Sequence, residues 1–306
     1  MSSKSNPLEE ALAPACAPVA GALASRELRA PAPSVEVRRN EPIGPWFDWN
    51  LRELAAYREL LYFFVWREIK VRYKQTVIGA GWAILQPVAT MVVFSLFFGR
   101  LAKIPSGGLP YPLFFYCAIL PWTYFSTALT GATGSVVENQ RVITKVYFPR
   151  VILPLSAVLS GLVDFAIAFV LLLGMALYYR VTPGPWLAFV PLFLLLAMLT
   201  AFGAGLWLAA LNALYRDVRY VVPFLAQFWM FASPVAYPSS LVPPGWRWLY
   251  GLNPMAGVID GFRWAITGEN PPSCALFAAS TAGVLMMLFA GLWYFRRMES
   301  VIADVV

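Results

Sequence analysis

The sequence contains no histidine among its 306 residues, which removes the commonest general base and the commonest metal ligand of proteins. Only three cysteines occur, Cys16, Cys117 and Cys274, and they are far apart and form no CxxC pair. This spacing indicates neither a zinc site nor a disulfide framework. Paired carboxylates of the catalytic kind are also missing. We therefore expect no catalytic residue and no metal site.

The chain also lacks a phosphate-binding loop of the form GxxxxGK[ST]. We therefore expect it neither to bind nor to hydrolyse ATP by itself, and to carry no cofactor of its own. An ion-coupled transporter usually has several ionisable groups within the bilayer, whereas the apolar stretches here contain one, Asp164. These absences favour a protein that moves something without performing chemistry on it.

Charged residues are scarce: they make up 13% of the chain, against 59% hydrophobic residues, and the mean hydropathy is +0.64. A soluble domain is usually about a quarter charged. A water-soluble fold has too little interior for this much apolar surface, so the bilayer is the expected solvent. The net charge of +7 then reflects topology, because Lys and Arg collect on the cytoplasmic side of membrane proteins.

Six stretches with little or no charge predict six transmembrane helices, since a helix needs about 20 apolar residues to cross a bilayer. The third contains a single charge, Asp164, and the fifth is short and contains Pro223 and Pro234. The predicted fold is all-α integral membrane, with a six-span transmembrane domain over residues 76–300. The predicted spans are residues 76–99, 109–137, 151–179, 186–211, 221–237 and 274–295.

Orientation follows from the distribution of Lys and Arg. With the N-terminus inside, 18 of the 23 fall on inside segments and 5 on outside segments; without residues 1–60 the ratio is 11 to 5. The bias predicts that both termini face the cytoplasm. We expect a multi-pass protein of the cytoplasmic (inner) membrane.

Two segments outside the spans have their own patterns. Residues 1–45 are rich in Ala, Pro and Ser without a sustained apolar core, which is typical of a disordered cytoplasmic tail and not of a signal peptide. Residues 46–75 contain a helical pattern with Trp66 and Tyr73 on an apolar stripe and Arg67 and Lys70 opposite. This pattern predicts an amphipathic helix in the membrane interface; the alternative is an amphipathic helix packed on a soluble core.

The segment between the fifth and sixth predicted spans, residues 238–273, is too long for a simple turn. Asn253 suits an N-cap, Pro254 suits the first helical position, and Gly268 can end the helix. We expect a short amphipathic helix over residues 253–267, external and re-entrant.

Four motifs bring in a resemblance: RYKQTVIGAGWAILQP (72–87), ITKVYFPRVILPLS (143–156), LNALYRDVRY (211–220) and LNPMAGVIDGFRW (252–264). In this order they resemble the type-two ABC transporter permeases that export bacterial cell-surface polysaccharides. The resemblance covers about residues 55–300. It implies export of a lipid-linked glycan of O-antigen, capsule or teichoic-acid type by a homodimer of permeases.

The resemblance also implies partners. Each permease would dock a cytoplasmic ABC ATPase, which binds ATP and Mg²⁺. The substrate would be a lipid-linked polysaccharide. No nucleic acid would be involved, since the basic residues are scattered. The alternatives are an exporter of drugs or lipids with the same scaffold, an integral-membrane glycan-modifying enzyme, and a membrane scaffold without transport. Missing histidine and carboxylate pairs argue against the enzyme.

In this family the loop between the second and third spans seats in the ATPase. Here that loop is residues 138–149, and its apolar side chains set among polar ones fit a partner pocket; an ordinary cytoplasmic loop is the alternative. The second cytoplasmic loop could add contacts, although positive-inside topology alone would explain its arginines. The predicted ATPase-coupling residues are Glu138, Arg141, Val142, Ile143, Lys145, Val146, Tyr147, Phe148, Arg216 and Asp217.

A translocation path for glycans would use aromatic rings, on which the CH faces of sugars stack. Lipid-facing and interfacial packing use aromatic rings as well. Asp164 could lie on the path or could form a helix-packing hydrogen bond to Ser156, to Ser160 or to a neighbouring span, because a buried carboxylate needs a partner. The predicted path residues are Trp122, Phe224, Phe228, Trp229 and Asp164.

Overall fold

The structure is a computed structural model that describes residues 55–74, 79–182, 184–269 and 271–305. These residues belong to one compact unit, Trp49–Val306. The predicted tail, residues 1–45, lies outside the described residues, as does the start of the predicted interface-helix region. Every regular element in the described part of the chain is a helix, which confirms the all-α prediction.

The elements follow one another along the chain with short connections. They are α3 (Arg58–Tyr73), η1 (Gly79–Gly81), α4 (Trp82–Phe94), η2 (Ser95–Leu101), α5 (Tyr111–Glu138), α6 (Gln140–Ile143), α7 (Ile152–Tyr178), η3 (Pro185–Phe189), α8 (Val190–Leu214), α9 (Val218–Phe231), η4 (Ser239–Leu241), η5 (Pro244–Trp246), α10 (Arg247–Gly251), α11 (Pro254–Thr267) and α12 (Cys274–Val305).

Among the described residues, five helical segments are long and apolar enough to cross a membrane: Trp82–Leu101, Tyr111–Glu138, Ile152–Tyr178, Pro185–Leu214 and Cys274–Glu299. They coincide with five of the six predicted spans. The remaining predicted span, the fifth (residues 221–237), corresponds to α9, which has 14 residues and ends at Phe231, six residues before the predicted end. The prediction of a multi-pass membrane protein is therefore confirmed, with five helical segments that are long and apolar enough to span a membrane.

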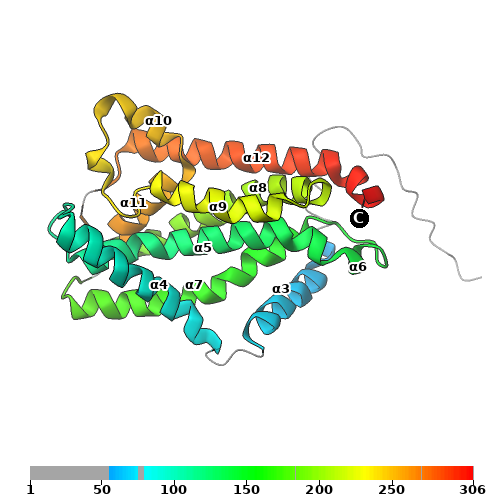
Figure 1. Ribbon diagram of the computed structural model, residues 1–306, viewed down its shortest axis with the longest axis horizontal. Helices are drawn as coiled ribbons and strands as arrows, with labels where there is room; N and C mark the ends of the chain where they lie inside the picture. Colours follow the sequence, from blue (N-terminus) through cyan, green and yellow to red (C-terminus); the bar gives the residue numbers. More distant parts are fainter. Residues whose placement is uncertain (1–54, 75–78, 183, 270, 306) are drawn as a thin grey trace, which may run out of the picture. The chain divides into compact units, whose positions relative to one another are not determined.

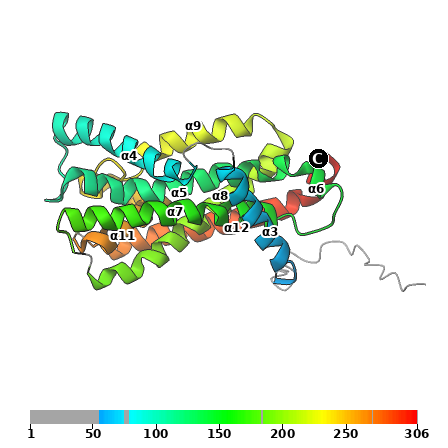
Figure 2. The same ribbon diagram turned by 90° about the horizontal axis from the view of Figure 1, so that it is seen from below.

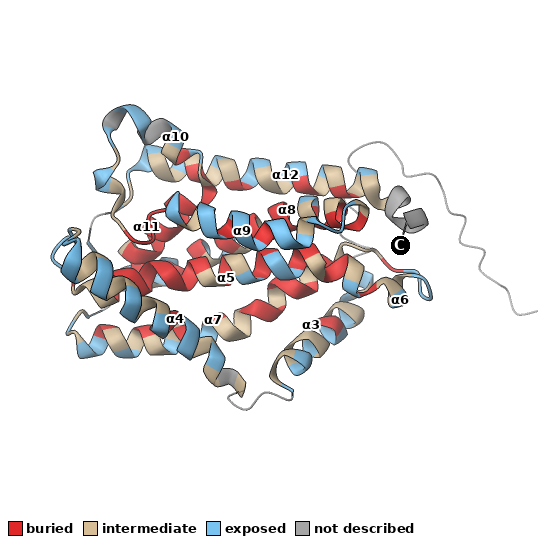
Figure 3. Cartoon of the chain, viewed as in Figure 1, coloured by how far each residue is buried: buried red, intermediate tan, exposed pale blue. Residues whose placement is uncertain are grey.

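Helix α5 lies at the centre of the bundle, with α7 and α8 on its sides and α12 packed on α8 (Figure 1). In the spanning segment of α5, 78% of the most apolar stretch is buried, whereas the value for α4 with η2 is 11%. Figure 3 shows the same contrast as a red α5 and a mostly tan and blue α4. The core therefore forms around α5, and α4 exposes apolar side chains.

Helices α8 and α12 approach one another closely because glycines face each other. A Cβ atom added at Gly291 would lie 2.0 Å from the carbonyl oxygen of Gly203, and one added at Gly203 would lie 2.6 Å from the Cα of Leu288. Small residues at such crossings let helix backbones touch in a membrane, where packing replaces the hydrophobic effect as the force between helices. This contact fixes α8 against α12.

Helix α11 forms where the sequence predicted it. The Asn253 side chain accepts a hydrogen bond from the backbone N–H of Met255, Pro254 opens the helix, and Gly268 ends it in the left-handed conformation with φ 71°. Helix α11 is buried along almost its whole length (Figure 3). It lies at the opposite end of the bundle from α6 and the C-terminal end of α12 (Figure 1).

Candidate functional site: helix α3 and the loop beside it

Helix α3 packs obliquely against α7 (Figure 2), and apolar side chains hold its N-terminal half. Phe64 is buried against Phe148, with 5.6 Å between the ring centroids. Ile152 and Leu153, in the first turn of α7, complete this buried cluster. We name Phe64, Phe148, Ile152 and Leu153 the apolar anchor. It joins α3 to the end of the predicted ATPase-coupling loop.

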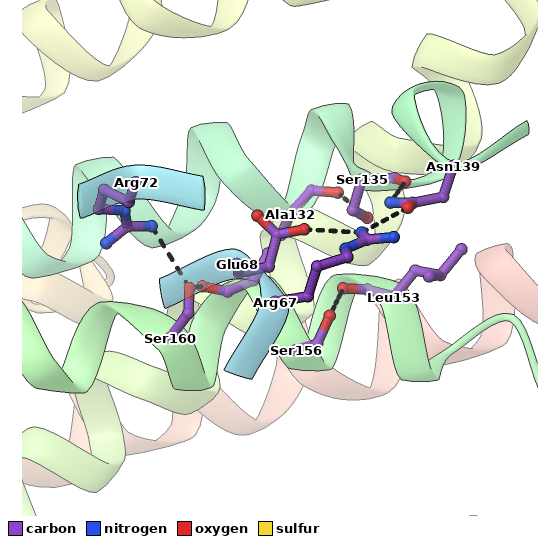
Figure 4. A network of polar contacts seen from close by, with 10 residues as sticks. Arg67, Glu68, Arg72, Ala132, Ser135, Asn139, Leu153, Ser156 and Ser160 are labelled. Atoms are coloured by element: carbon purple, nitrogen blue, oxygen red, sulfur yellow. Dashed lines mark hydrogen bonds and ion pairs between the residues drawn. The ribbon is translucent and has the colours of Figure 1, made fainter. Parts of the chain in front are cut away.

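One turn further along α3, a polar contact reaches the start of the same loop (Figure 4). The Arg67 guanidinium donates to the Asn139 side-chain oxygen at 2.5 Å and to Glu68 at 3.0 Å. Asn139 is buried, and its amide nitrogen donates to the backbone oxygen of Ser135 at 2.7 Å. The coupling loop is therefore attached to α3 at both of its ends. The sequence pattern had placed Arg67 opposite the apolar stripe and gave no sign of this partner.

The last turn of α3 holds the carboxylate of α7. The Arg72 guanidinium forms an ion pair with Asp164, and the Tyr73 hydroxyl donates to the other oxygen of the same carboxylate. Arg72 also donates to the Ser160 hydroxyl at 3.3 Å (Figure 4). We name Arg72, Tyr73, Ser160 and Asp164 the polar clasp. The partners of Asp164 thus come from α3 and not from a neighbouring span.

The Tyr73 hydroxyl acts as a donor in the clasp over the whole physiological pH range. Burial, and next the hydrogen bond to the Asp164 carboxylate, raise the pKa of Tyr73 to about 12. A tyrosine with this pKa stays protonated at neutral pH. The Asp164 carboxylate therefore receives one charged and one neutral donor.

A pocket of about 210 Å³ opens beside the clasp, between α3, α4, α5 and α7. Its walls are mainly apolar and aromatic, with a few polar groups, as is usual for pockets that accept small molecules or water. It is lined by Arg72, Tyr73, Gly79, Trp82, Ala83, Gln86, Pro87, Leu120, Thr123, Tyr124, Thr127, Gly161, Asp164, Phe165 and Ala168.

The structure separates the predicted coupling residues into two groups. Phe148 is 4% exposed and Val142 and Ile143 pack against the apolar anchor, so these three hold the loop on the protein. Tyr147 is 71% exposed. The exposed group consists of Glu138, Arg141, Lys145, Val146 and Tyr147 in this loop, with Arg216 and Asp217 in the second loop.

The predicted path aromatics also divide. Trp122 is buried, and its ring lies 6.5 Å from that of Trp229, which is half-buried and donates its indole N–H to Asn253 at 2.9 Å. The Phe224 and Phe228 rings lie on the outer face of α9 with 4.5 Å between their centroids and a tilt of 59° between their planes, and the two side chains are 59% and 60% exposed. The structure brings the four together as an inner pair and an outer pair, and Asp164 lies elsewhere, in the clasp.

The end of the bundle that contains α11 has another ion pair, which the sequence pattern did not predict. Arg263 bonds to Asp260 at 3.4 Å and to the backbone oxygen of Pro234 at 2.7 Å, and its guanidinium lies 3.8 Å from the centroid of the Phe114 ring. Both charged side chains are 9% exposed. The i, i+3 spacing of an acid and a base within an apolar helix was the available signal.

The three polar groups that fix the turn after α9 explain why this helix stops at Phe231. Arg263 holds Pro234, Asn253 donates to the backbone oxygen of Ala232 at 3.2 Å, and Tyr111 donates to that of Ala236 at 2.8 Å. The predicted fifth span therefore continues as a non-helical segment that α5 and α11 hold in place. We name Asn253, Asp260 and Arg263 the brace.

Comparison with known proteins shows which family this chain resembles. The family model for ABC-2 type transporters matches residues 59–267. The O-antigen export system permease protein RfbA of Myxococcus xanthus is 31% identical over 81% of this chain and 96% of its own length. RfbA of Klebsiella pneumoniae is 26% identical over 67% of this chain and 79% of its own.

A transport protein from a third organism is similar as well. The polysialic acid transport protein KpsM of Escherichia coli is 26% identical over 76% of this chain and 91% of its own length. The family match begins at the first turn of α3 and ends at the last residue of α11, so it includes the anchor, the clasp and the brace. The chain belongs to the ABC-2 type transporter family.

Proposed function

We propose that the chain is the membrane permease subunit of an ATP-driven exporter that moves a lipid-linked cell-surface polysaccharide across the cytoplasmic membrane. The observation that carries this proposal is the match to an O-antigen export permease over 96% of that protein's length. The chain would perform no chemistry; ATP and Mg²⁺ would bind to a separate ATPase subunit. Both termini would face the cytoplasm, with α6 on that side and α11 outside.

The ATPase would dock on residues 138–149. Tyr147 and Val146 are 71% and 56% exposed although one is aromatic and the other apolar, and the charged residues Lys145 and Arg150 lie close to them in the sequence. An exposed aromatic anchor with a polar rim is the usual form of a protein interface. Arg216 and Asp217 would add contacts at the edge of this surface.

Two copies would pair through α4 and α9, whose outer faces are apolar. Phe97 on η2, and Phe224, Leu225 and Phe228 on α9, are all at least half exposed. In this assembly α9 and the braced turn after it would act as the sixth membrane-crossing segment. Helix α3 would lie in the cytoplasmic interface of the membrane, because Tyr62 and Trp66 are 70% and 47% exposed beside its basic residues.

The polysaccharide would pass between the paired copies. Phe224 and Phe228 present neighbouring, tilted rings on the side of α9 that would face the path, and Trp122 and Trp229 support the helix from behind. Aromatic rings offer flat surfaces that tolerate the variety of sugars in a glycan. Asp164 would act through the clasp and would not contact the glycan.

The test is a strain in which the chain has been deleted. We expect surface polysaccharide to disappear and the lipid-linked form to accumulate at the inner leaflet, and the wild-type chain to restore export. Phe224→Ala with Phe228→Ala should reduce export, whereas Leu192→Ala, an exposed apolar residue on α8, should not. Normal surface polysaccharide in the deletion strain would rule the proposal out. If the strain instead loses export of a drug or a lipid, the chain would be the permease of an exporter for that substrate.

A further inference from the structure

Helix α3 is attached to α7 at two places by opposite kinds of interaction. The apolar anchor is almost entirely buried, with Phe64 1% and Leu153 1% exposed. In the polar clasp the side chains of Arg72 and Asp164 are 33% and 27% exposed. The anchor is a packed core, and the clasp is a charged contact at the edge of a pocket.

The difference matters energetically. Removal of a buried Phe from a core is among the most destabilising single changes, because burial is lost and a cavity remains. A partly exposed ion pair contributes little, because the Coulomb attraction is offset by the loss of hydration and of side-chain freedom. The anchor therefore suffices to keep α3 on the bundle, and the clasp can open without releasing the helix.

The pocket beside the clasp allows the separated side chains of an open clasp to be hydrated. A carboxylate that loses its cation in a membrane span needs water or another partner. Asp164 lines the pocket together with the polar side chains of Gln86, Thr123 and Thr127. Arg72 has a long side chain near the predicted membrane surface, where it can turn to water. Both partners of the pair can therefore be hydrated where they are.

Helix α3 connects the clasp to residues 138–149, the loop that would receive the ATPase. Phe148 and Asn139 hold α3 at Phe64 and Arg67. From Phe64 to Tyr73 the helix advances about 13 Å, and α7 advances about 18 Å from Ile152 to Asp164, at 1.5 Å per residue. A tilt of the loop thus turns α3 about the anchor and acts on the clasp at its far end.

We propose that α3 is a lever in the transport cycle, with the apolar anchor as its pivot and the Arg72–Asp164 pair as a joint that opens and closes once per cycle. Arg72, Tyr73 and Asp164 are positioning residues: they act through the orientation of α3 against α7 and not by contact with the glycan. The lever deepens the proposed function and rests on it. Two discrete arrangements of one packed element are the usual basis of such coupling.

The direct test measures the distance between α3 and α7. Spin labels go on Cys introduced at Val71 and Val170, which are 66% and 69% exposed, after replacement of Cys16, Cys117 and Cys274. Pulsed electron paramagnetic resonance is recorded on the complete complex with its ATPase, nucleotide-free and trapped with ATP and vanadate. We expect two distinct distance distributions. Identical distributions in both states would overturn the lever.

The functional test uses a matched pair of variants on the same helix. Arg72→Met removes the cation of the clasp, and Lys70→Met removes an exposed cation two residues away. We expect the Arg72 variant to insert, to bind the ATPase and to hydrolyse ATP while export falls roughly tenfold, within the range typical of coupling free energies. The Lys70 variant should export normally. Normal export by both variants would contradict the proposal.

A tightening variant separates a joint from a static brace. Ser160→Asp places a second carboxylate where the Arg72 guanidinium already bonds at 3.3 Å. If the pair must open in each cycle, this variant should export less than wild type. If the contact is static, export should stay at the wild-type level. If wild-type complex exports no polysaccharide, the proposed function fails. If wild type exports but neither the distances nor the Arg72 and Ser160 variants differ from it, only the lever fails.

Discussion

The Arg72–Asp164 and Arg263–Asp260 pairs have the same chemistry and opposite settings. The first joins two helices across 92 positions of sequence and remains about one-third exposed beside a pocket. The second lies within one helix, is 9% exposed, and is tied further to a backbone oxygen and to an aromatic ring. The first pair can separate at little cost, whereas the second is built into the core. Burial, more than charge, decides which pair is a joint and which is a brace.

The largest effect is expected at the brace. Arg263→Met should lower the free energy of unfolding by about 4 kcal/mol, because it leaves the Asp260 carboxylate buried without its cation. Thermal unfolding of the detergent-solubilised chain measures this. Arg100→Met, at an exposed position, is the control. A similar stability for both variants would show that the brace is not structural.

The anchor should be nearly as sensitive, and its neighbour should not be. Phe148→Ala empties a buried site against Phe64 and should cost about 3 kcal/mol. Tyr147→Ala should change stability by less than about 0.5 kcal/mol, since the side chain is 71% exposed, yet should abolish co-purification of the ATPase. If Tyr147→Ala retains the ATPase, the docking surface lies elsewhere.

An intermediate effect is expected at Asn253, which caps α11 and also bonds to Trp229, to Ser233 and to the backbone of Ala232. Asn253→Ala should cost about 2 kcal/mol, at the upper end for N-caps, because the turn after α9 is freed at the same time. Limited proteolysis of membrane vesicles should then cut near residues 232–237. Protection equal to that of wild type would contradict this account of the turn.

The smallest effect on stability is expected at the clasp. Asp164→Asn should change the free energy of unfolding by about 1 kcal/mol or less, since the pair is partly exposed and Asn still accepts from Tyr73. Asp260→Asn is the matched change in the brace and should cost more. A reversed order, measured in the same thermal assay, would invalidate the contrast between the two pairs.

Local chemistry made part of the fold predictable. Asn253, Pro254 and Gly268 mark the ends of α11 by capping rules that need no tertiary information, and hydropathy located five spanning helices. The short α9 was not predictable, because its end depends on hydrogen bonds from Tyr111, Asn253 and Arg263 in other helices. The six-span count with both termini inside stays a prediction.

The candidate site was predictable only in outline. The loop at residues 138–149 was recognised from its motif and its apolar residues, but burial of Phe148 depends on Phe64, far away in sequence. Asp164 was recognised as a charge in need of a partner, and its partners Arg72 and Tyr73 lie 92 and 91 positions away. Helical periodicity assigns such residues to faces and does not show which face meets which helix.

The glycine contact between α8 and α12 has a consequence for the rest of the molecule. Because the backbone of Gly203 touches that of Gly291, no side chain separates the two helices at this crossing that could change rotamer and let them slide there. With α11 packed on both, they form a stator: a part that keeps its geometry while another part turns against it. A methyl group at Gly203 would push α8 and α12 apart, and would disturb every movement of another part against this stator.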